Sequence, residues 1–274
     1  MKMKYDPGET WRSIYRENKR CDGFNNYYDD ESASYQFSEN PYVWKDGKER
    51  CRTIGMQNDW TALDIGAGAG SMTVPLAKIC KRVTAVEPSK TMARILSSNL
   101  KKAGLDNVQI INSRWEDAPE EIERHDIIIA AYSLMIDDIE KAVLRMNSLA
   151  RKKVYLYWFA GVPYWERHCL DLWSTIYGYE YTPSPKVDLI FAVLYKHGIY
   201  PDVVNLDSER PPYERVMTTE QAMDELKDSL HLKGNDEWDE LLMRYIEDNY
   251  EKKEDGCWSR GGSSRMRISW SPQP

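Results

Sequence analysis

The chain has 274 residues, and 37 lysines and arginines against 44 aspartates and glutamates give it a net charge of −7. This balance disfavours generic nucleic acid as a partner, because a phosphate backbone would be repelled unless the basic residues gathered on one face. No apolar run approaches the about 20 residues of a membrane span, and Met1 to Asp6 lack the apolar region of a signal peptide. Five scattered cysteines without close pairs indicate reduced thiols and no metal site. We therefore expect a cytoplasmic protein with no membrane partner.

Residues 1–58 are polar, charged and aromatic, and only Thr10 to Tyr15 suggests a short helix. The aromatic residues of this segment are Trp11, Tyr15, Tyr27, Tyr28, Tyr35, Tyr42 and Trp44. So many rings are costly to leave in water, so we expect them to cover another surface. We predict an N-terminal cap that acts as a lid over the carboxyl edge of a sheet; packing on a remote face for stability alone is the alternative.

From Trp60 onward, short apolar runs alternate with amphipathic segments, which is typical of βα repeats that feed a parallel sheet. The predicted strands are residues 62–65, 83–87, 108–112, 127–132 and 154–159. A helix capped by Ser89 and ended by Gly104 lies between the second and third strands, and residues 139–149 form a helix between the fourth and fifth. The pattern predicts a doubly wound α/β core over residues 59–160.

Residues 161–274 are expected to complete the sheet and to carry insertions on the substrate side. Gly161 to Pro185 is rich in tryptophan and tyrosine and broken by prolines, so we expect an irregular insertion there. The segments predicted after it are a helix over 187–197, a strand over 200–206, a helix opened by Thr218 and Gln221 at capping-box spacing, a helix after 235–236, and a strand over 266–270 that follows a Gly261-Gly262 turn.

A glycine-rich turn follows the first predicted strand, in the stretch from Thr61 to Ser71. Glycines at alternate positions allow a sharp turn and let the backbone approach a ligand closely. Such a turn can hold the pyrophosphate of NAD or FAD, the phosphates of a nucleotide, or the amino-acid end of S-adenosylmethionine. The last is favoured because Asp64 would repel a pyrophosphate, and because G-x-G-x-G is one residue short of the dinucleotide pattern. Asp64 is placed either to hold an ammonium group or to order the turn.

Glu87 ends the second predicted strand about 20 residues after the turn, where a carboxylate accepts hydrogen bonds from ribose hydroxyls. The segments Val86 to Ser89 and Ser113 to Ala118 continue the pattern. Over roughly Trp60 to Phe159 the sequence resembles the class I S-adenosylmethionine-dependent methyltransferases. The resemblance implies their Rossmann-like fold, with a mostly parallel seven-stranded sheet, an N-terminal cap and a C-terminal helical insertion.

The resemblance also implies which residues bind S-adenosylmethionine. They are Asp64, Gly66, Ala67, Gly68 and Gly70 for the methionine part, Glu87 for the ribose, Pro88, Met92, Trp115 and Glu116 for the adenine, and Ala131 at the strand end that leads to the acceptor. Arg114 departs from the family pattern, because many relatives place an aspartate there to contact the adenine amino group. The resemblance then assigns that contact to Glu116.

Tyr132 and Ser133 follow the end of a strand, where open sheets bind their ligands, so Tyr132 is a candidate catalytic residue near the transferred methyl group. His168 is a candidate general base. Each candidate has a plain alternative: packing for Tyr132 and Trp115, an exposed acid for Glu116, and a surface or capping histidine for His168.

Methyl transfer from a sulfonium is an in-line displacement in which the protein positions the acceptor and excludes water. A catalytic triad or metal cluster is therefore not required. We predict a methyltransferase that acts on a small molecule and releases S-adenosylhomocysteine. A protein or RNA acceptor is an alternative, and so is a non-catalytic regulator that binds S-adenosylmethionine. An NAD-dependent oxidoreductase is disfavoured by the glycine spacing.

Overall fold

The computed structural model describes residues 5–21, 34, 38–207, 215–256, 258–260 and 264–272. A seven-stranded sheet has the order β3-β2-β1-β4-β5-β10-β6. Its strands are β1 (Thr61–Ile65), β2 (Arg82–Val86), β3 (Val108–Ile111), β4 (His125–Ala131), β5 (Ala150–Ala160), β6 (Asp202–Asn205) and β10 (Ser264–Trp270). The first five are parallel, and β10 runs antiparallel to β5 and β6. The predicted mostly parallel seven-stranded sheet is confirmed, with β5 starting four residues earlier than expected.

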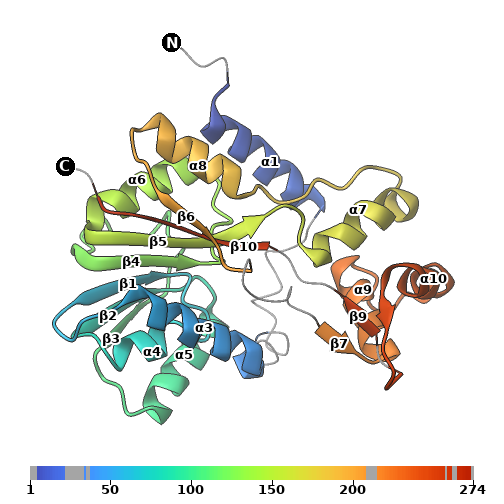
Figure 1. Ribbon diagram of the computed structural model, residues 1–274, viewed down its shortest axis with the longest axis horizontal. Coiled ribbons are helices and arrows are strands. Elements are labelled where there is room, and N and C mark those ends of the chain that lie inside the picture. Colours follow the sequence, from blue (N-terminus) through green and yellow to red (C-terminus); the bar gives the residue numbers. More distant parts are fainter. Residues whose placement is uncertain are drawn as a thin grey trace.

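Helices cover both faces of the sheet (Figure 1). On one face lie α1 (Pro7–Cys21), α6 (Ile139–Leu149) and α8 (Val187–Lys196). On the other face lie α3 (Pro41–Ile54), α4 (Thr73–Ala77) and α5 (Lys90–Lys102). The strands form the middle layer because they are apolar on both faces, as central parallel strands are; Leu63, Ile128 and Ile129 are fully buried. The predicted Ser89 cap is confirmed, since its hydroxyl accepts a hydrogen bond from the Met92 N–H at 3.2 Å.

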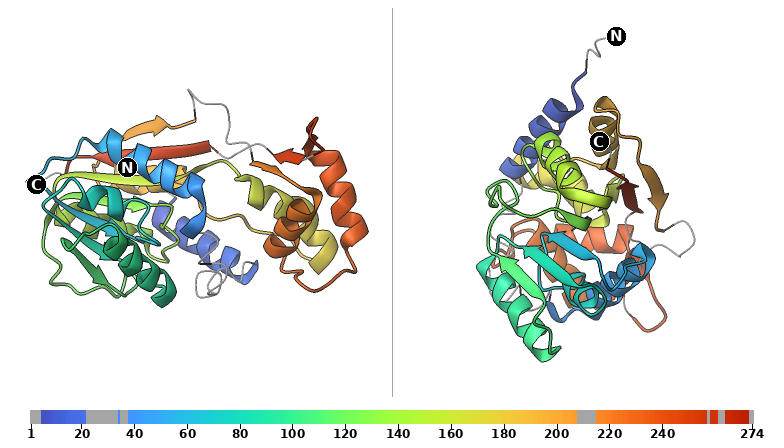
Figure 2. Two further views of the ribbon diagram at one scale, coloured as in Figure 1. Left: turned by 90° about the horizontal axis from the view of Figure 1, so that it is seen from below. Right: turned by 90° about the vertical axis from the view of Figure 1, so that its left-hand side faces the viewer.

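A separate helical unit lies beyond the carboxyl end of β5 (Figures 1 and 2). It contains α7 (Tyr164–Tyr177), α9 (Thr219–Ser229), α10 (Asp239–Asn249) and a small sheet of β7 (Arg215–Met217), β9 (Trp258–Arg260) and β8 (Glu251–Lys252). The unit has its own apolar cluster around Trp173, Leu226 and Ile246. The predicted capping box of Thr218 and Gln221 is present at the start of α9.

The expectation of an irregular insertion from Gly161 to Pro185 is wrong, because most of it forms α7. The prolines flank this helix and do not interrupt it. Pro163 is the N-cap residue, where its missing N–H costs nothing, and Gly178 ends the helix in the left-handed conformation. The segment after Gly178 is irregular, as expected. The predicted Gly261-Gly262 turn lies outside the described residues.

The N-terminal segment is more helical than its sequence suggests. The short helix expected at Thr10 to Tyr15 extends over the whole of α1, and α3 was not predicted. Trp11 and Tyr15 are buried against the sheet and its helices, as expected of rings that cover a surface. Tyr42 is 58% exposed, which contradicts that expectation for this ring. Tyr27, Tyr28 and Tyr35 lie outside the described residues.

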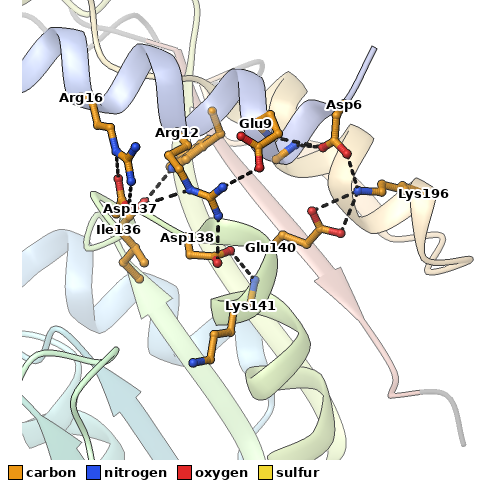
Figure 3. Close-up of polar contacts among 12 residues, drawn as sticks. Asp6, Glu9, Arg12, Arg16, Ile136, Asp137, Asp138, Glu140, Lys141 and Lys196 are labelled. Atoms are coloured by element: carbon orange, nitrogen blue, oxygen red, sulfur yellow. Dashed lines mark hydrogen bonds and ion pairs between the residues drawn. The ribbon is translucent and has the colours of Figure 1, made fainter. Parts of the chain in front are cut away.

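Polar contacts attach α1 to the loop that follows β4 (Figure 3). The Trp11 indole donates a hydrogen bond to the Ile136 carbonyl at 2.7 Å. Arg16 pairs with Asp137 through two hydrogen bonds of 2.8 and 2.9 Å. These contacts hold the N-terminal helix at the carboxyl edge of the sheet. Within the part of the chain that the structure describes, no helix has both the length and the apolar character needed to cross a membrane.

Asp64, in β1, is buried and accepts a hydrogen bond from the Thr73 hydroxyl of α4 at 2.6 Å. Burial raises the pKa of this carboxyl to about 6, although the Thr73 hydrogen bond and the charge of Arg50 oppose the shift. The folded chain therefore holds the Asp64 proton to a higher pH than the unfolded chain does.

Replacement of Trp11 by phenylalanine should lower the free energy of unfolding by about 1–3 kcal/mol, because the buried Ile136 carbonyl loses its donor. Urea denaturation measures the change. Tyr42→Phe, at a 58% exposed ring, is the matched control and should have little effect. A Trp11→Phe variant as stable as the wild type would show that this contact contributes nothing.

The wild-type free energy of unfolding should fall as pH rises from about 4 to about 6, because the unfolded chain releases the Asp64 proton at lower pH than the folded chain does. Asp64→Asn can still accept the Thr73 hydrogen bond but does not titrate. It should flatten the pH dependence in this interval and be more stable than the wild type near neutral pH, by up to roughly 3 kcal/mol. Denaturation curves across this range test this, and identical slopes for both proteins would contradict it.

Candidate active site

The glycine-rich turn connects β1 to α4 and packs against the end of β2. Gly66, Gly68 and Gly70 have φ values of 72°, 55° and 99°, which side chains rarely adopt. The N–H groups of Gly66 and Ala67 both donate to the Val86 carbonyl, at 2.8 and 3.1 Å. This docking brings the turn to the carboxyl edge of the sheet, where open α/β sheets bind ligands.

Two of the glycines have close neighbours, and one borders open space. A Cβ on Gly66 would lie 2.2 Å from the Ser133 Cβ, and one on Gly70 would lie 2.6 Å from a Leu96 methyl group. A Cβ on Gly68 would meet nothing within 4 Å. The backbone at Gly68 is therefore where a ligand can approach the turn most closely.

Glu87 directly follows β2 and lies beside this open backbone. The residue is 5% exposed, and its carboxylate accepts hydrogen bonds from the Gly68 N–H at 2.7 Å and the Ser89 N–H at 2.9 Å. These bonds hold the carboxylate beside the turn. An acceptor next to an open glycine backbone fits the ribose hydroxyls and the amino-acid part of S-adenosylmethionine.

Asp64 lies beneath the turn. Its hydrogen bond from Thr73 joins β1 to α4, a contact that fits a residue that orders the turn. Contact of Asp64 with the cofactor stays a prediction. Met92 is 1% exposed and packs with Ala69 and Ile95, and Pro88 is exposed. The turn residues, Glu87, Pro88 and Met92 thus lie on neighbouring segments at one edge of the sheet.

Trp115 and Glu116 have different surroundings. Trp115 is 4% exposed, donates to the Ala142 carbonyl at 3.4 Å and has the Arg145 guanidinium over its ring at 4.3 Å. These contacts account for Trp115 by packing. Glu116 is exposed and forms an ion pair with Arg114 at 3.1 Å. Arg114, which stands where many relatives have an aspartate, therefore contacts the acid to which the adenine contact is assigned. Adenine binding by Trp115 and Glu116 stays a prediction.

Tyr132 directly follows Ala131, the last residue of β4, and has a positive φ of 57°. Side chains rarely adopt this conformation, and it is concentrated at functional sites. The ring stacks on Phe159 at 4.8 Å and lies under the Arg50 guanidinium at 5.0 Å. Its hydroxyl is buried and has no hydrogen-bond partner within the described residues. Burial raises the pKa of the Tyr132 phenol, which therefore stays protonated at neutral pH.

Ser133 joins the end of β4 to the glycine turn. Its hydroxyl donates to the Ile65 carbonyl at 2.6 Å, and its Cβ occupies the space beside Gly66. Tyr132 is thus next in sequence to a residue that contacts the turn. The structure brings this candidate and the turn to the same edge of the sheet.

His168 lies on α7 and is fully buried. The first turn of the same helix reaches the aromatic residues at the sheet edge, since Trp165 packs edge-on against Phe159 at 5.0 Å. His168 lies about one helical turn further along the chain. Its role as a general base stays a prediction.

Arg50, which contacts Tyr132 from α3, is a site residue that was not predicted from the sequence. Arg50 precedes the first strand and lies outside the sequence motifs that carry the family resemblance, so its sequence position does not mark it as a site residue. A weak signal was present: Gly47, Arg50, Cys51 and Ile54 recur at helical spacing and are the buried residues of α3.

Comparisons with known proteins agree with this geometry. A family profile described as a methyltransferase domain matches residues 62–153, which contain the glycine turn, Glu87 and Tyr132. The YcgJ protein of Bacillus subtilis has a solved structure that superposes with a TM-score of 0.59 at 14% identity, covering 84% of this chain and 99% of that one. At this identity the likeness shows the fold.

Two curated relatives match by sequence. An uncharacterized protein of Haemophilus influenzae is 28% identical over 160 residues, which is 58% of each chain. A protein of Methanocaldococcus jannaschii named "Probable cobalt-precorrin-6B C(15)-methyltransferase (decarboxylating)" is 29% identical over 129 residues, or 44% of this chain and 67% of the relative. The match thus spans between about half and two thirds of these relatives. Residues 62–153 thus form a methyltransferase domain, with the glycine turn, the acidic residue after β2 and the sheet order of the class I S-adenosylmethionine-dependent type.

Proposed function

We propose that the chain transfers a methyl group from S-adenosylmethionine to a small-molecule acceptor and releases S-adenosylhomocysteine. The observation that carries this proposal is the position of Glu87. Its carboxylate is held beside the open backbone of Gly68, at the edge of the sheet where Tyr132 follows the last residue of β4. A cofactor site and a candidate acceptor site are thus adjacent.

When bound, S-adenosylmethionine supplies both the electrophilic methyl group and the leaving group. The residues of the chain then have to bind the cofactor, orient the acceptor and exclude water. Glu87 accepts hydrogen bonds from the ribose, and Gly66 to Gly70 allow the backbone to approach the methionine part. Ser133 keeps the end of β4 against the turn through its bond to the Ile65 carbonyl.

The acceptor side of the site is aromatic. Phe159 contacts both Tyr132 and Trp165, and these rings come from β5, the end of β4 and α7. Aromatic faces suit a flat or cationic small molecule, and a protonated phenol donates a hydrogen bond and does not remove a proton. The name of the Methanocaldococcus jannaschii relative gives a cobalt-precorrin, a small molecule, as its methyl acceptor, which supports this acceptor class. The net charge of −7 weighs against an RNA acceptor.

We assign residues 59–160 to the cofactor-binding core, residues 1–58 to a lid, and residues 161–274 to completion of the sheet and to the substrate side. The lid is supported by the contacts that hold α1 on the loop after β4 (Figure 3). We place the activity in the cytoplasm, which fits the free, buried thiols of Cys21, Cys51, Cys80 and Cys169.

Glu87→Gln should weaken binding of S-adenosylhomocysteine by ~1.5–3 kcal/mol, because the ribose loses a charged acceptor. Isothermal titration calorimetry measures the affinity. Glu123→Gln is the matched control: Glu123 precedes β4 at the opposite edge of the sheet and is exposed, so its variant should bind like the wild type. Equal affinities for wild type and Glu87→Gln would mean that the carboxylate does not contact the ligand.

The function itself is tested with S-adenosylmethionine that carries an isotopic label on its methyl group. Saturating S-adenosylhomocysteine should raise the melting temperature, because only the folded chain binds it, whereas NADH should not. Label should then appear in the small-molecule filtrate of a cell extract in a compound other than S-adenosylmethionine. Label found only in the protein or RNA fraction would exclude the small-molecule acceptor. Binding without transfer to any fraction would indicate a non-catalytic regulator.

A further inference from the structure

Arg50 is a buried cation in the middle of α3, with 7% of its side chain exposed. Its guanidinium lies 5.0 Å from the centre of the Tyr132 ring and 5.5 Å from that of the Tyr157 ring. Asp46, one turn earlier in the same helix, forms an ion pair with it. A planar guanidinium can stack on aromatic faces while it keeps an ion pair, which an ammonium group does less well.

A chain of alternating charges fixes Arg50 in this place. Asp46 also pairs with Arg265 of β10 at 3.1 Å, and Arg265 pairs with Asp207, just after β6, at 2.7 Å. Arg265 is also the residue of β10 that lies opposite Phe159 in the sheet. These ion pairs are largely withdrawn from water, which costs desolvation, and the best-attested use of such pairs is to specify one arrangement. Here they specify how α3 lies against the ends of β5 and β10.

The same helix also touches the end of the glycine turn. A Cβ on Gly47 would lie 2.3 Å from the carbonyl oxygen of Ser71, so only glycine permits this approach. Helix α3 therefore contacts the cofactor side of the site through Gly47 and the acceptor side through Arg50. The position of α3 thus links the cofactor side of the site to the acceptor side.

We propose that α3 completes the active site and that Arg50 is a positioning residue that holds the Tyr132 ring on the acceptor side. This inference rests on the methyltransferase function proposed above. Tyr132 is in a backbone conformation that needs support from its surroundings. Phe159 supports one face of its ring, and Arg50 lies over the ring as well. Loss of the planar cation should let the ring move while the cofactor side stays intact.

The test compares Arg50→Lys and Arg50→Met with Arg52→Met, an exposed arginine on the same helix. Arg50→Lys should bind S-adenosylhomocysteine within about twofold of the wild type. Its transfer of label from S-adenosylmethionine into the small-molecule filtrate should fall by ~10-fold or more, because small misplacements at a reacting centre are costly. Arg52→Met should leave both unchanged. Unchanged transfer by Arg50→Lys and Arg50→Met would overturn the proposal.

A double-mutant cycle with Tyr132→Leu, which removes the ring that Arg50 contacts, separates positioning from general stability. If Arg50 acts through the Tyr132 ring, the pair Arg50→Lys and Tyr132→Leu should lose little more transfer than Tyr132→Leu alone. Multiplied losses would overturn the proposal, because they would show that Arg50 acts independently of Tyr132.

A readout that does not need the acceptor is the 19F NMR signal of fluorotyrosine placed at position 132. Arg50→Lys should shift and broaden this signal, whereas Arg52→Met should not. An identical signal in all three proteins would overturn the proposal. A wild-type chain that transfers no label overturns the proposed function, and the fluorine signal then still shows whether Arg50 holds the ring.

Discussion

The carboxylate of Glu87 accepts hydrogen bonds from the backbone of Gly68 and Ser89, and the geometry of the site depends on this interaction. It ties the glycine turn to the end of β2, next to the docking of Gly66 on the Val86 carbonyl. The result is a buried negative charge beside a stretch of open backbone. A ligand with ribose hydroxyl donors matches both features, and the G-x-G-x-G spacing of the turn favours S-adenosylmethionine over a dinucleotide.

Segments outside the core converge on this edge of the sheet from both ends of the chain. The N-terminal helix α1 is held on the loop after β4. Helix α3 contacts both Ser71 and Tyr132, and α7 brings Trp165 to Phe159. None of these contacts is needed to form a parallel sheet. Their convergence on the end of β4 is explained if that end is where the acceptor is positioned, and it gives the cap and the helical unit a functional reason to pack there.

The elements that could be predicted from the sequence are those whose signal is local. Apolar runs, the Ser89 cap, the capping box at Thr218 and the glycine spacing each reflect neighbouring residues, and the corresponding elements are present. Helix α3 was missed because its buried face includes a glycine and an arginine in place of a continuous apolar stripe. Helix α7 was missed because prolines were interpreted as breaks when they flank it. The contact between Arg50 and Tyr132 joins segments far apart in the chain, so no local pattern encodes it.

The most direct test of this account is a crystal structure of the full chain with S-adenosylhomocysteine. We expect density at the carboxyl edge of β1 and β2, with the ribose hydroxyls within hydrogen-bond distance of Glu87 and the homocysteine part along Gly66 to Gly70. The ring of Tyr132 should lie on the side of the sulfur from which an acceptor would approach. Ligand density at another edge of the sheet, or a ribose that does not contact Glu87, would contradict it.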